Sequence, residues 1–167
     1  SATALDGYLF PDTYHFPRRT SAAQIASAMV ARFRKVYREL ESRHSPGRPA
    51  REIVILASLI EKETGVPGER PLVAGVFYNR LGANLPLQCD PTVIYAALLG
   101  GRYRGAIHQR DLSFQSPYNT YLARGLPPGP IANPGRGSLE AALAPAATDY
   151  LYFVSNGQGG HRFSTSL

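Results

Sequence analysis

The sequence predicts an α+β fold in which several short helices surround a central buried helix and strands from both chain ends form a small sheet. A continuous apolar run at residues 53–60 predicts the central helix, and 16 glycines and 14 prolines, unevenly placed, divide the chain into short elements. Aromatic-rich segments at residues 5–16 and 150–164 are typical of strands. With 167 residues, we expect one domain of ordinary size over residues 1–167. Because the chain does not begin with Met, we expect it to be a fragment of a longer protein.

Residues 5–16 alternate aromatic and polar side chains, contain Pro11, and are predicted to form short extended segments with a turn. Residues 21–43 are predicted to form an amphipathic helix, because apolar side chains recur there every three or four positions. A second helix is predicted over residues 50–64, ending at Gly65, where a left-handed cap is favoured. It is apolar on nearly every side, so we expect it at the centre.

Two further helices are predicted over residues 70–81 and 90–100. The first has helical apolar spacing and is closed by Gly82. The second begins with Asp90 and Pro91, a pair that is typical of an N-cap and a first turn.

Residues 116–137 hold five prolines and four glycines, so we expect an ordered functional loop there. Ser138 is expected to cap a short alanine-rich helix. The segments 150–154 and 161–164 flank a turn-prone Asn-Gly pair and are predicted to form a hairpin.

Composition limits the class of partner. The chain has a net charge of +6, which favours an anionic partner. Its arginines are scattered and no nucleic-acid-binding module is recognisable, so we do not expect nucleic acid as a partner. Cys89 is the only cysteine and the histidines lack metal-ligand spacing, so we expect no disulfide, metal site or other cofactor. The longest apolar run is far too short to span a membrane.

Charged residues at the end of the predicted central helix are the strongest candidates for catalysis. Helical geometry places Glu63 nearer the apolar side than Glu61, with Lys62 pointing nearly opposite. A carboxyl held against apolar surface at the negative end of a helix has its charged form disfavoured, so the pKa of Glu63 is predicted to be raised. General acid catalysis near neutrality requires such a pKa. The alternative is a solvated helix end at which both glutamates face water.

The same geometry excludes a catalytic pair made from the two glutamates. Glu61 and Glu63 project roughly 160° apart on a helix. A glycosidase with two facing carboxylates therefore needs Asp12, Asp90 or Asp111 as its second acid.

Two further segments set polar side chains among aromatic rings and prolines. Such a mixture binds sugars, because flat rings stack on pyranose faces while amides and hydroxyls bind the sugar hydroxyls. The alternative is that these side chains cap a helix or pack in the core. The residues concerned are Gln88, Asp90 and Thr92 in the first segment, and Tyr118, Asn119, Thr120 and Tyr121 in the second.

Eight segments together resemble one protein family, in that family's order. They are DGYLFPDTY (6–14), ILASLIEKETG (55–65), ER (69–70), VAGVFYNRL (73–81), LPLQCDPTVIY (85–95), PYNTY (117–121), GLPPGPIANPG (125–135) and YLYFVSNGQGGHRFS (150–164). With these segments the chain resembles the catalytic domain of the endolytic murein transglycosylases, the YceG-like family of bacterial cell-wall enzymes.

The resemblance implies cleavage of the β-1,4 bond between MurNAc and GlcNAc without water, leaving 1,6-anhydroMurNAc ends and limiting nascent glycan strands. It implies that Glu63 is the essential catalytic acid. One carboxyl suffices for this reaction: Glu63 protonates the leaving oxygen, and its carboxylate then takes the proton of the sugar's own C6 hydroxyl as that oxygen closes on C1. Because the nucleophile is tethered to the reacting carbon, no second carboxylate is needed.

Substrate-binding residues are also implied by the matching segments, and no metal ligand is among them. They are Glu61, Gln88, Asp90, Thr92, Tyr118, Asn119, Thr120, Tyr121 and His161. Two positions depart from the family pattern: Asp6 stands where Glu is usual, and Cys89 where Thr is usual. Cys89 argues against an essential hydroxyl at its position.

The resemblance further implies peptidoglycan glycan strands as substrate and peptidoglycan synthases as partners. It implies a location at the bacterial cytoplasmic membrane, with the catalytic domain on the extracytoplasmic side. The family's N-terminal membrane helix and LysM-like subdomain have no counterpart in this sequence, so we expect membrane anchoring through that segment alone.

Three alternatives compete with this function. A hydrolytic muramidase differs only in using water, and a non-catalytic glycan-binding module retains the cleft alone. The family has also been described as aminodeoxychorismate lyase, a pyridoxal phosphate activity, but neither Lys35 nor Lys62 is placed to form a Schiff base.

Overall fold

The computed structural model describes residues 5–44 and 47–166 of the chain. Its α+β fold class is the one that the sequence predicts. The elements follow in the order α1 (Ala22–Glu41), α2 (Ala50–Glu63), η1 (Pro67–Glu69, a 3-10 turn), α3 (Arg70–Gly82), α4 (Asp90–Leu99), η2 (Gln109–Ser113, also 3-10), α5 (Arg136–Leu143), β1 (Tyr152–Ser155) and β2 (His161–Ser164). None of the helices in the described part of the chain is long and apolar enough to cross a membrane.

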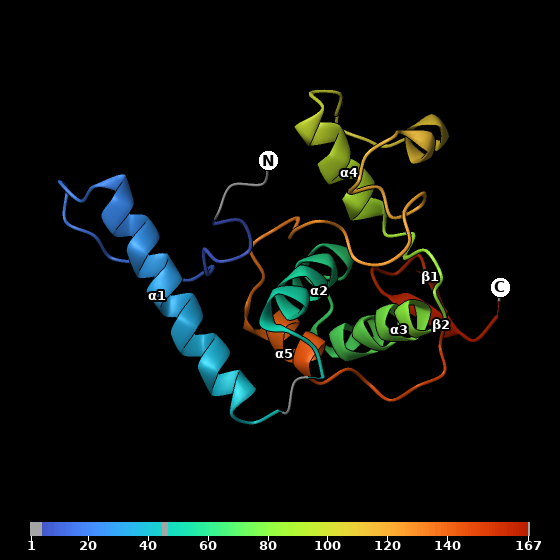
Figure 1. Ribbon diagram of the computed structural model, residues 1–167, viewed down its shortest axis with the longest axis horizontal. Coiled ribbons are helices and arrows are strands. Elements are labelled where there is room, and N and C mark those ends of the chain that lie inside the picture. The colour runs from blue at the N-terminus through green and yellow to red at the C-terminus, as the bar shows by residue number, and fades with distance from the viewer. Residues whose placement is uncertain (1–4, 45–46, 167) are drawn as a thin grey trace.

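Helix α2 is the central helix. Every residue from 53 to 60 is buried, and the helix packs against α3, α4 and α5. Figure 1 shows α2, α3 and α5 grouped in the body of the molecule, with α1 on one side of this group and α4 on the other. Because α2 is enclosed along most of its length, the position of its last turn is fixed by the core.

Helix α1 lies along the outside and is amphipathic, as its periodicity predicts. Ser21 and Gln24 form a capping box at its start: the Ser21 hydroxyl accepts from the Gln24 amide at 3.3 Å, and the Gln24 side chain accepts from the Ser21 amide at 2.9 Å. Its inner face buries Phe33, Val36 and Leu40.

The end of α2 differs from the prediction, because Gly65 is not a left-handed cap. The helix ends at Glu63, and Thr64 follows in an extended conformation with φ −131°. The Thr64 hydroxyl accepts from the Val66 amide at 3.0 Å and donates to Glu69 at 3.1 Å. A side chain therefore stabilises this turn, and no left-handed residue is needed.

Two predicted N-caps are also wrong. Cys89, not Asp90, occupies the N-cap position of α4, and Asp90 is the first residue of the helix. Gly135, not Ser138, occupies the N-cap position of α5, which starts three residues earlier than predicted. Both Asp90 and Ser138 use their side chains in tertiary contacts instead.

The sheet is built from the C-terminal region alone. Strands β1 and β2 pair antiparallel, with Ser155 opposite His161. Residues 5–21, the described part of the N-terminal segment, contain no strand, so the prediction of a sheet from both chain ends is wrong. This segment packs against the proline-rich loop instead: the Leu9 amide donates to the Asn133 side chain at 3.1 Å, and a Cβ on Gly7 would lie 2.5 Å from the Pro130 ring.

The proline-rich loop at residues 116–137 is ordered, as predicted, and contains no helix or strand before α5 begins at Arg136. Asn119 lies fully buried within it and donates from its amide to the carbonyls of Leu112 and Phe114, each at 2.9 Å. These bonds replace the backbone ladders that prolines and turns cannot form.

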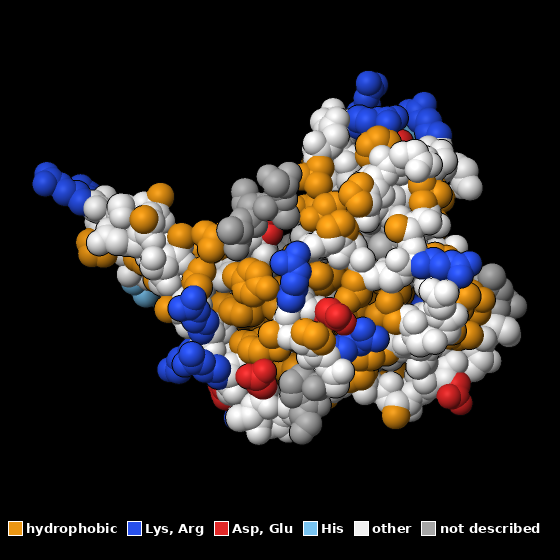
Figure 2. Space-filling model, in the orientation of Figure 1, with side chains coloured by type: hydrophobic (Ala, Val, Ile, Leu, Met, Phe, Trp, Pro, Cys, Tyr) orange, Lys and Arg blue, Asp and Glu red, His pale blue; other side chains and the backbone are white. Residues whose placement is uncertain are grey.

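Basic side chains gather over the outer end of the lobe formed by α4 and the chain that follows it (Figure 2). The exposed arginines there are Arg102, Arg104 and Arg110. With Asp111 and His108 they line a hollow of about 420 Å³.

Candidate active site

Glu63 lies at the last position of α2 and lines an open cleft of about 370 Å³. The walls come from the end of α2, from α3, from the segment that leads into α4, and from β1 and the start of β2. Besides Glu63, the lining residues are Val76, Arg80, Leu87, Gln88, Asp90, Tyr121, Leu151, Tyr152, Phe153, Val154, Ser155 and His161.

The carboxyl of Glu63 is largely removed from water. Burial raises its pKa from the ordinary 4.5 to about 7, and the negative charge of Asp90 acts in the same direction. A hydrogen bond from the Cys89 thiol to Oε2, at 3.3 Å, and the nearby His161 lower the pKa in part. The predicted direction of the shift is confirmed, and Glu63 holds its proton for about half of the time near neutral pH.

The neighbouring glutamate points to a different part of the molecule. Glu61 Oε2 accepts from the Gly135 amide at 3.0 Å and from the Ser138 hydroxyl at 2.6 Å. These bonds fasten the start of α5 to α2. Glu61 does not line the cleft, so the predicted divergence of Glu61 and Glu63 is confirmed, while a substrate contact for Glu61 stays a prediction.

Four of the predicted substrate-binding residues do lie in the cleft with Glu63, namely Gln88, Asp90, Tyr121 and His161. The Tyr121 hydroxyl donates a short hydrogen bond to Asp90 Oδ1. Gln88 accepts from the Arg80 guanidinium and has a φ of 53°, a left-handed conformation that is costly for a residue with a side chain.

The other predicted residues in these two segments are buried behind the cleft wall: Thr92, Tyr118, Asn119 and Thr120. The Thr120 hydroxyl accepts from the Cys89 amide at 3.0 Å and lies 2.8 Å from the Thr92 hydroxyl. Tyr118 packs against Tyr95, with ring centroids 4.9 Å apart. In the structure these side chains fix the segment that carries Gln88 and Asp90.

Arg80 is a cleft residue that the sequence analysis missed. Its guanidinium donates to the carbonyls of Pro86 at 2.9 Å and Leu151 at 2.8 Å, so it joins the segment before α4 to the chain entering β1. Burial lowers its pKa, yet it stays a cation at any ordinary pH. A lone arginine within the apolar pattern of residues 73–81 was the available signal.

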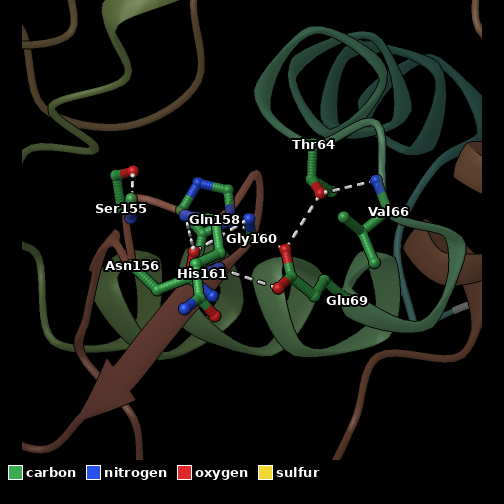
Figure 3. Close-up of polar contacts among 9 residues, drawn as sticks. Thr64, Val66, Glu69, Ser155, Asn156, Gln158, Gly160 and His161 are labelled. Atoms are coloured by element: carbon green, nitrogen blue, oxygen red, sulfur yellow. Dashed lines mark hydrogen bonds and ion pairs between the residues drawn. The ribbon is translucent and has the colours of Figure 1, made fainter.

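Glu69 is the second residue that the sequence analysis missed. Its Oε1 accepts from the His161 amide at 2.8 Å, and its Oε2 lies 2.7 Å from His161 Nδ1 (Figure 3). The Thr64 hydroxyl donates to the same Oε2 at 3.1 Å. Glu69 thereby links the turn after α2 to the start of β2, on the side of the cleft that holds His161.

Other chemistries find less support in the described residues. No group of three or more His, Cys, Asp or Glu side chains within residues 5–44 and 47–166 is arranged to hold a metal ion. Lys35 and Lys62 are exposed and do not line the cleft, so neither is placed to form a Schiff base with a cofactor in the cleft. Asp12 is paired with Arg32 at 2.7 Å outside the cleft, so Asp90 is the nearer candidate for a second carboxylate.

The fold and cleft define an α+β protein in which one cleft carboxyl with a raised pKa is placed for acid–base chemistry. The YceG-like family model matches residues 1–167, and the chain belongs to the YceG-like family. It is 44% identical over 165 residues to the endolytic murein transglycosylase of Bacillus subtilis (strain 168), covering 98% of this chain and 45% of that protein. It is 36% identical over 158 residues to the protein of the same name from Streptococcus pneumoniae serotype 2, covering 91% of this chain and 28% of that protein.

A solved structure shares the fold. The crystal structure of a yceG-like protein from Listeria monocytogenes superposes with a TM-score of 0.82 at 41% identity, covering 98% of this chain and 53% of that one. The chain thus spans about half, or less, of the length of these relatives.

Proposed function

We propose that this chain is the catalytic part of an endolytic lytic transglycosylase, which cleaves the MurNAc–GlcNAc β-1,4 bond of peptidoglycan and leaves 1,6-anhydroMurNAc ends. The observation that carries the proposal is Glu63, a carboxyl with a pKa of about 7 inside an open cleft. The name shared by the relatives, endolytic murein transglycosylase, supports the same substrate and reaction.

In the proposed reaction Glu63 acts first as an acid. Its proton passes to the oxygen of the scissile glycosidic bond, and the bond from that oxygen to C1 breaks. The C6 hydroxyl of the same MurNAc then closes on C1, and its proton returns to the Glu63 carboxylate. No water is consumed, and Glu63 ends as it began. Because the attacking hydroxyl is already tethered to the ring, its effective concentration replaces the second carboxylate of a hydrolase.

A hydrolytic muramidase is the second candidate, and one observation favours it. Asp90 lies in the same cleft as Glu63 and close enough for its charge to raise the Glu63 pKa. A hydrolase uses a second carboxylate as base or nucleophile. The short hydrogen bond from Tyr121 to Asp90 Oδ1 weakens this candidate, because a carboxylate held in that way is a poorer base.

Purified peptidoglycan and mass spectrometry of the released fragments separate these functions. We expect soluble fragments with anhydro ends, each lighter by one water than the corresponding reducing end. Reducing ends would establish the muramidase instead. We expect the Glu63→Gln variant to release no fragments but still to bind peptidoglycan. If this variant releases as many fragments as the wild type, the role of Glu63 is refuted. Absence of release by the wild-type chain, with binding intact, would favour the non-catalytic module.

The proposal extends to where the chain works. A nascent glycan strand is made outside the cytoplasmic membrane, so we place this chain on the extracytoplasmic side, anchored there by a segment outside this sequence and close to peptidoglycan synthases. Crosslinking of the full-length protein in cells tests whether it lies close to peptidoglycan synthases.

A further inference from the structure

We propose that Glu69 is a positioning residue of this site: it holds His161 in one tautomer and one orientation, so that His161 Nε2 accepts a hydrogen bond from a hydroxyl of the glycan in the cleft. This inference rests on the proposed function, because it deepens the description of how the same cleft binds its substrate.

The tautomer follows from the partner of Nδ1. Hydrogen bonds from His161 keep the pKa of Glu69 below its usual value, so Glu69 is a carboxylate near neutral pH. A carboxylate can only accept, so Nδ1, at 2.7 Å from Oε2, must carry the hydrogen. In a neutral imidazole the other nitrogen, Nε2, is then an acceptor.

The orientation is fixed from several sides. Glu69 binds both the backbone amide and the ring of His161, and both side chains are only 16% exposed. The ring also packs edge-on against Phe153, with centroids 5.2 Å apart. No protein hydrogen bond to Nε2 occurs among the described residues, while His161 itself lines the cleft, so this nitrogen is left for a ligand.

The turn between β1 and β2 is shaped for this contact. The Asn156 side chain accepts from the amides of Gln158 and Gly160, which closes the turn (Figure 3). A Cβ on Gly160 would lie 2.5 Å from Glu69 Oε1. Glycine at this position therefore lets Glu69 approach His161. This close approach explains why a glycine stands directly before His161.

Glu69→Gln tests the proposal without changing the shape of the side chain. Its amide nitrogen can donate to Nδ1, which favours the opposite tautomer and turns Nε2 into a donor. We expect ¹⁵N NMR of His161 to show this exchange of tautomers. We also expect kcat/KM for release of glycan fragments to fall by about 3- to 10-fold, the range for loss of a hydrogen bond between neutral groups.

Four further variants make the test specific. Gly160→Ala should displace the Glu69 carboxylate and produce the same kind of change, without altering either partner. His161→Gln, whose amide can place an acceptor near the Nε2 position, should retain more activity than His161→Ala. Glu39→Gln removes a carboxylate that is paired with Arg136 at 2.8 Å on the outer helix α1, and should leave both readouts unchanged.

Each outcome bears on the proposal separately from the function. If Glu69→Gln leaves the tautomer of His161 unchanged, the positioning role is refuted. If the tautomer changes but kcat/KM stays within twofold of the wild-type value, the contact with substrate is refuted. If the wild-type chain releases no fragments at all, the proposed function fails, while the NMR measurement still decides the role of Glu69.

Discussion

Replacing Glu63 with glutamine is expected to make the protein more stable at alkaline pH while it removes catalysis. Glu63 has a pKa of about 7 in the folded chain, against an ordinary value of 4.5. Since the folded-state pKa is raised, the stability associated with protonated Glu63 is fully present below about pH 4.5 and is lost as the pH rises through 7. One pKa unit is worth about 1.4 kcal/mol, so the carboxylate costs the folded state about 3 kcal/mol at pH 9. Glutamine is neutral and avoids this cost.

Urea unfolding of the wild-type chain and Glu63→Gln at pH 4 and pH 9 measures the effect. We expect the advantage of the variant in free energy of unfolding to grow by about 3 kcal/mol between these pH values, or by roughly 6–12 °C in Tm for a domain of this size. Glu41→Gln, at an exposed position on α1, is the matched control and should show no such growth. A difference between Glu63→Gln and the wild type that is the same at both pH values would refute the claim that Glu63 is buried with its proton.

Three other measurements follow from the structure. Cys89→Ala removes the thiol that donates to Glu63, so the pKa of Glu63 should rise and the alkaline limb of the pH–rate profile should move to higher pH. Cys89→Thr offers a stronger donor and should move this limb to lower pH. If the limb moves in neither variant, the contact between Cys89 and Glu63 is contradicted. Glu61→Gln should cost about 1–3 kcal/mol of stability, measured by urea unfolding, because it weakens two partly buried hydrogen bonds to the start of α5, and it should retain kcat. A loss of kcat with unchanged stability would instead support a substrate contact. Binding of peptidoglycan, measured by co-sedimentation, should weaken as the NaCl concentration rises to several hundred millimolar. This loss should be steeper for the wild type than for a variant in which the arginines beyond α4 are neutralised. An affinity that does not depend on salt would exclude an electrostatic contribution. The arginines concerned are Arg102, Arg104 and Arg110.

The helices could be predicted from the sequence because their signals are local. Apolar periodicity placed α1 and α2 within two residues of their observed ends. The caps were predicted wrongly where a side chain has a distant partner: Ser138 donates to Glu61, 77 residues away, and so does not cap α5. The sheet was predicted wrongly because aromatic residues near the N-terminus serve packing against α1, where Tyr8 meets Phe33 edge-on at 5.1 Å, and not strand pairing.

The site could be predicted in part for the same reason. The position of Glu63 relative to Glu61 follows from helix geometry alone. Helix geometry does not show which polar loop residues line the cleft and which are buried. Asn119 is buried and donates to loop carbonyls, whereas Gln88 is exposed and lines the cleft, yet both carry the same amide group. The pairing of Glu69 with His161 spans 92 residues and has no local signal.

The surroundings of Glu63 explain how one carboxyl can serve in both halves of the proposed reaction. A carboxyl with the ordinary pKa of 4.5 would be almost fully ionised at neutral pH and would lack the proton for the leaving oxygen; a carboxyl with a much higher pKa would keep that proton as a poor acid. Burial and Asp90 raise the pKa, whereas Cys89 and His161 lower it, and the result lies at about 7. Near that pH the acid and its conjugate base are equally populated, so neither the donation nor the later removal of the proton is strongly disfavoured.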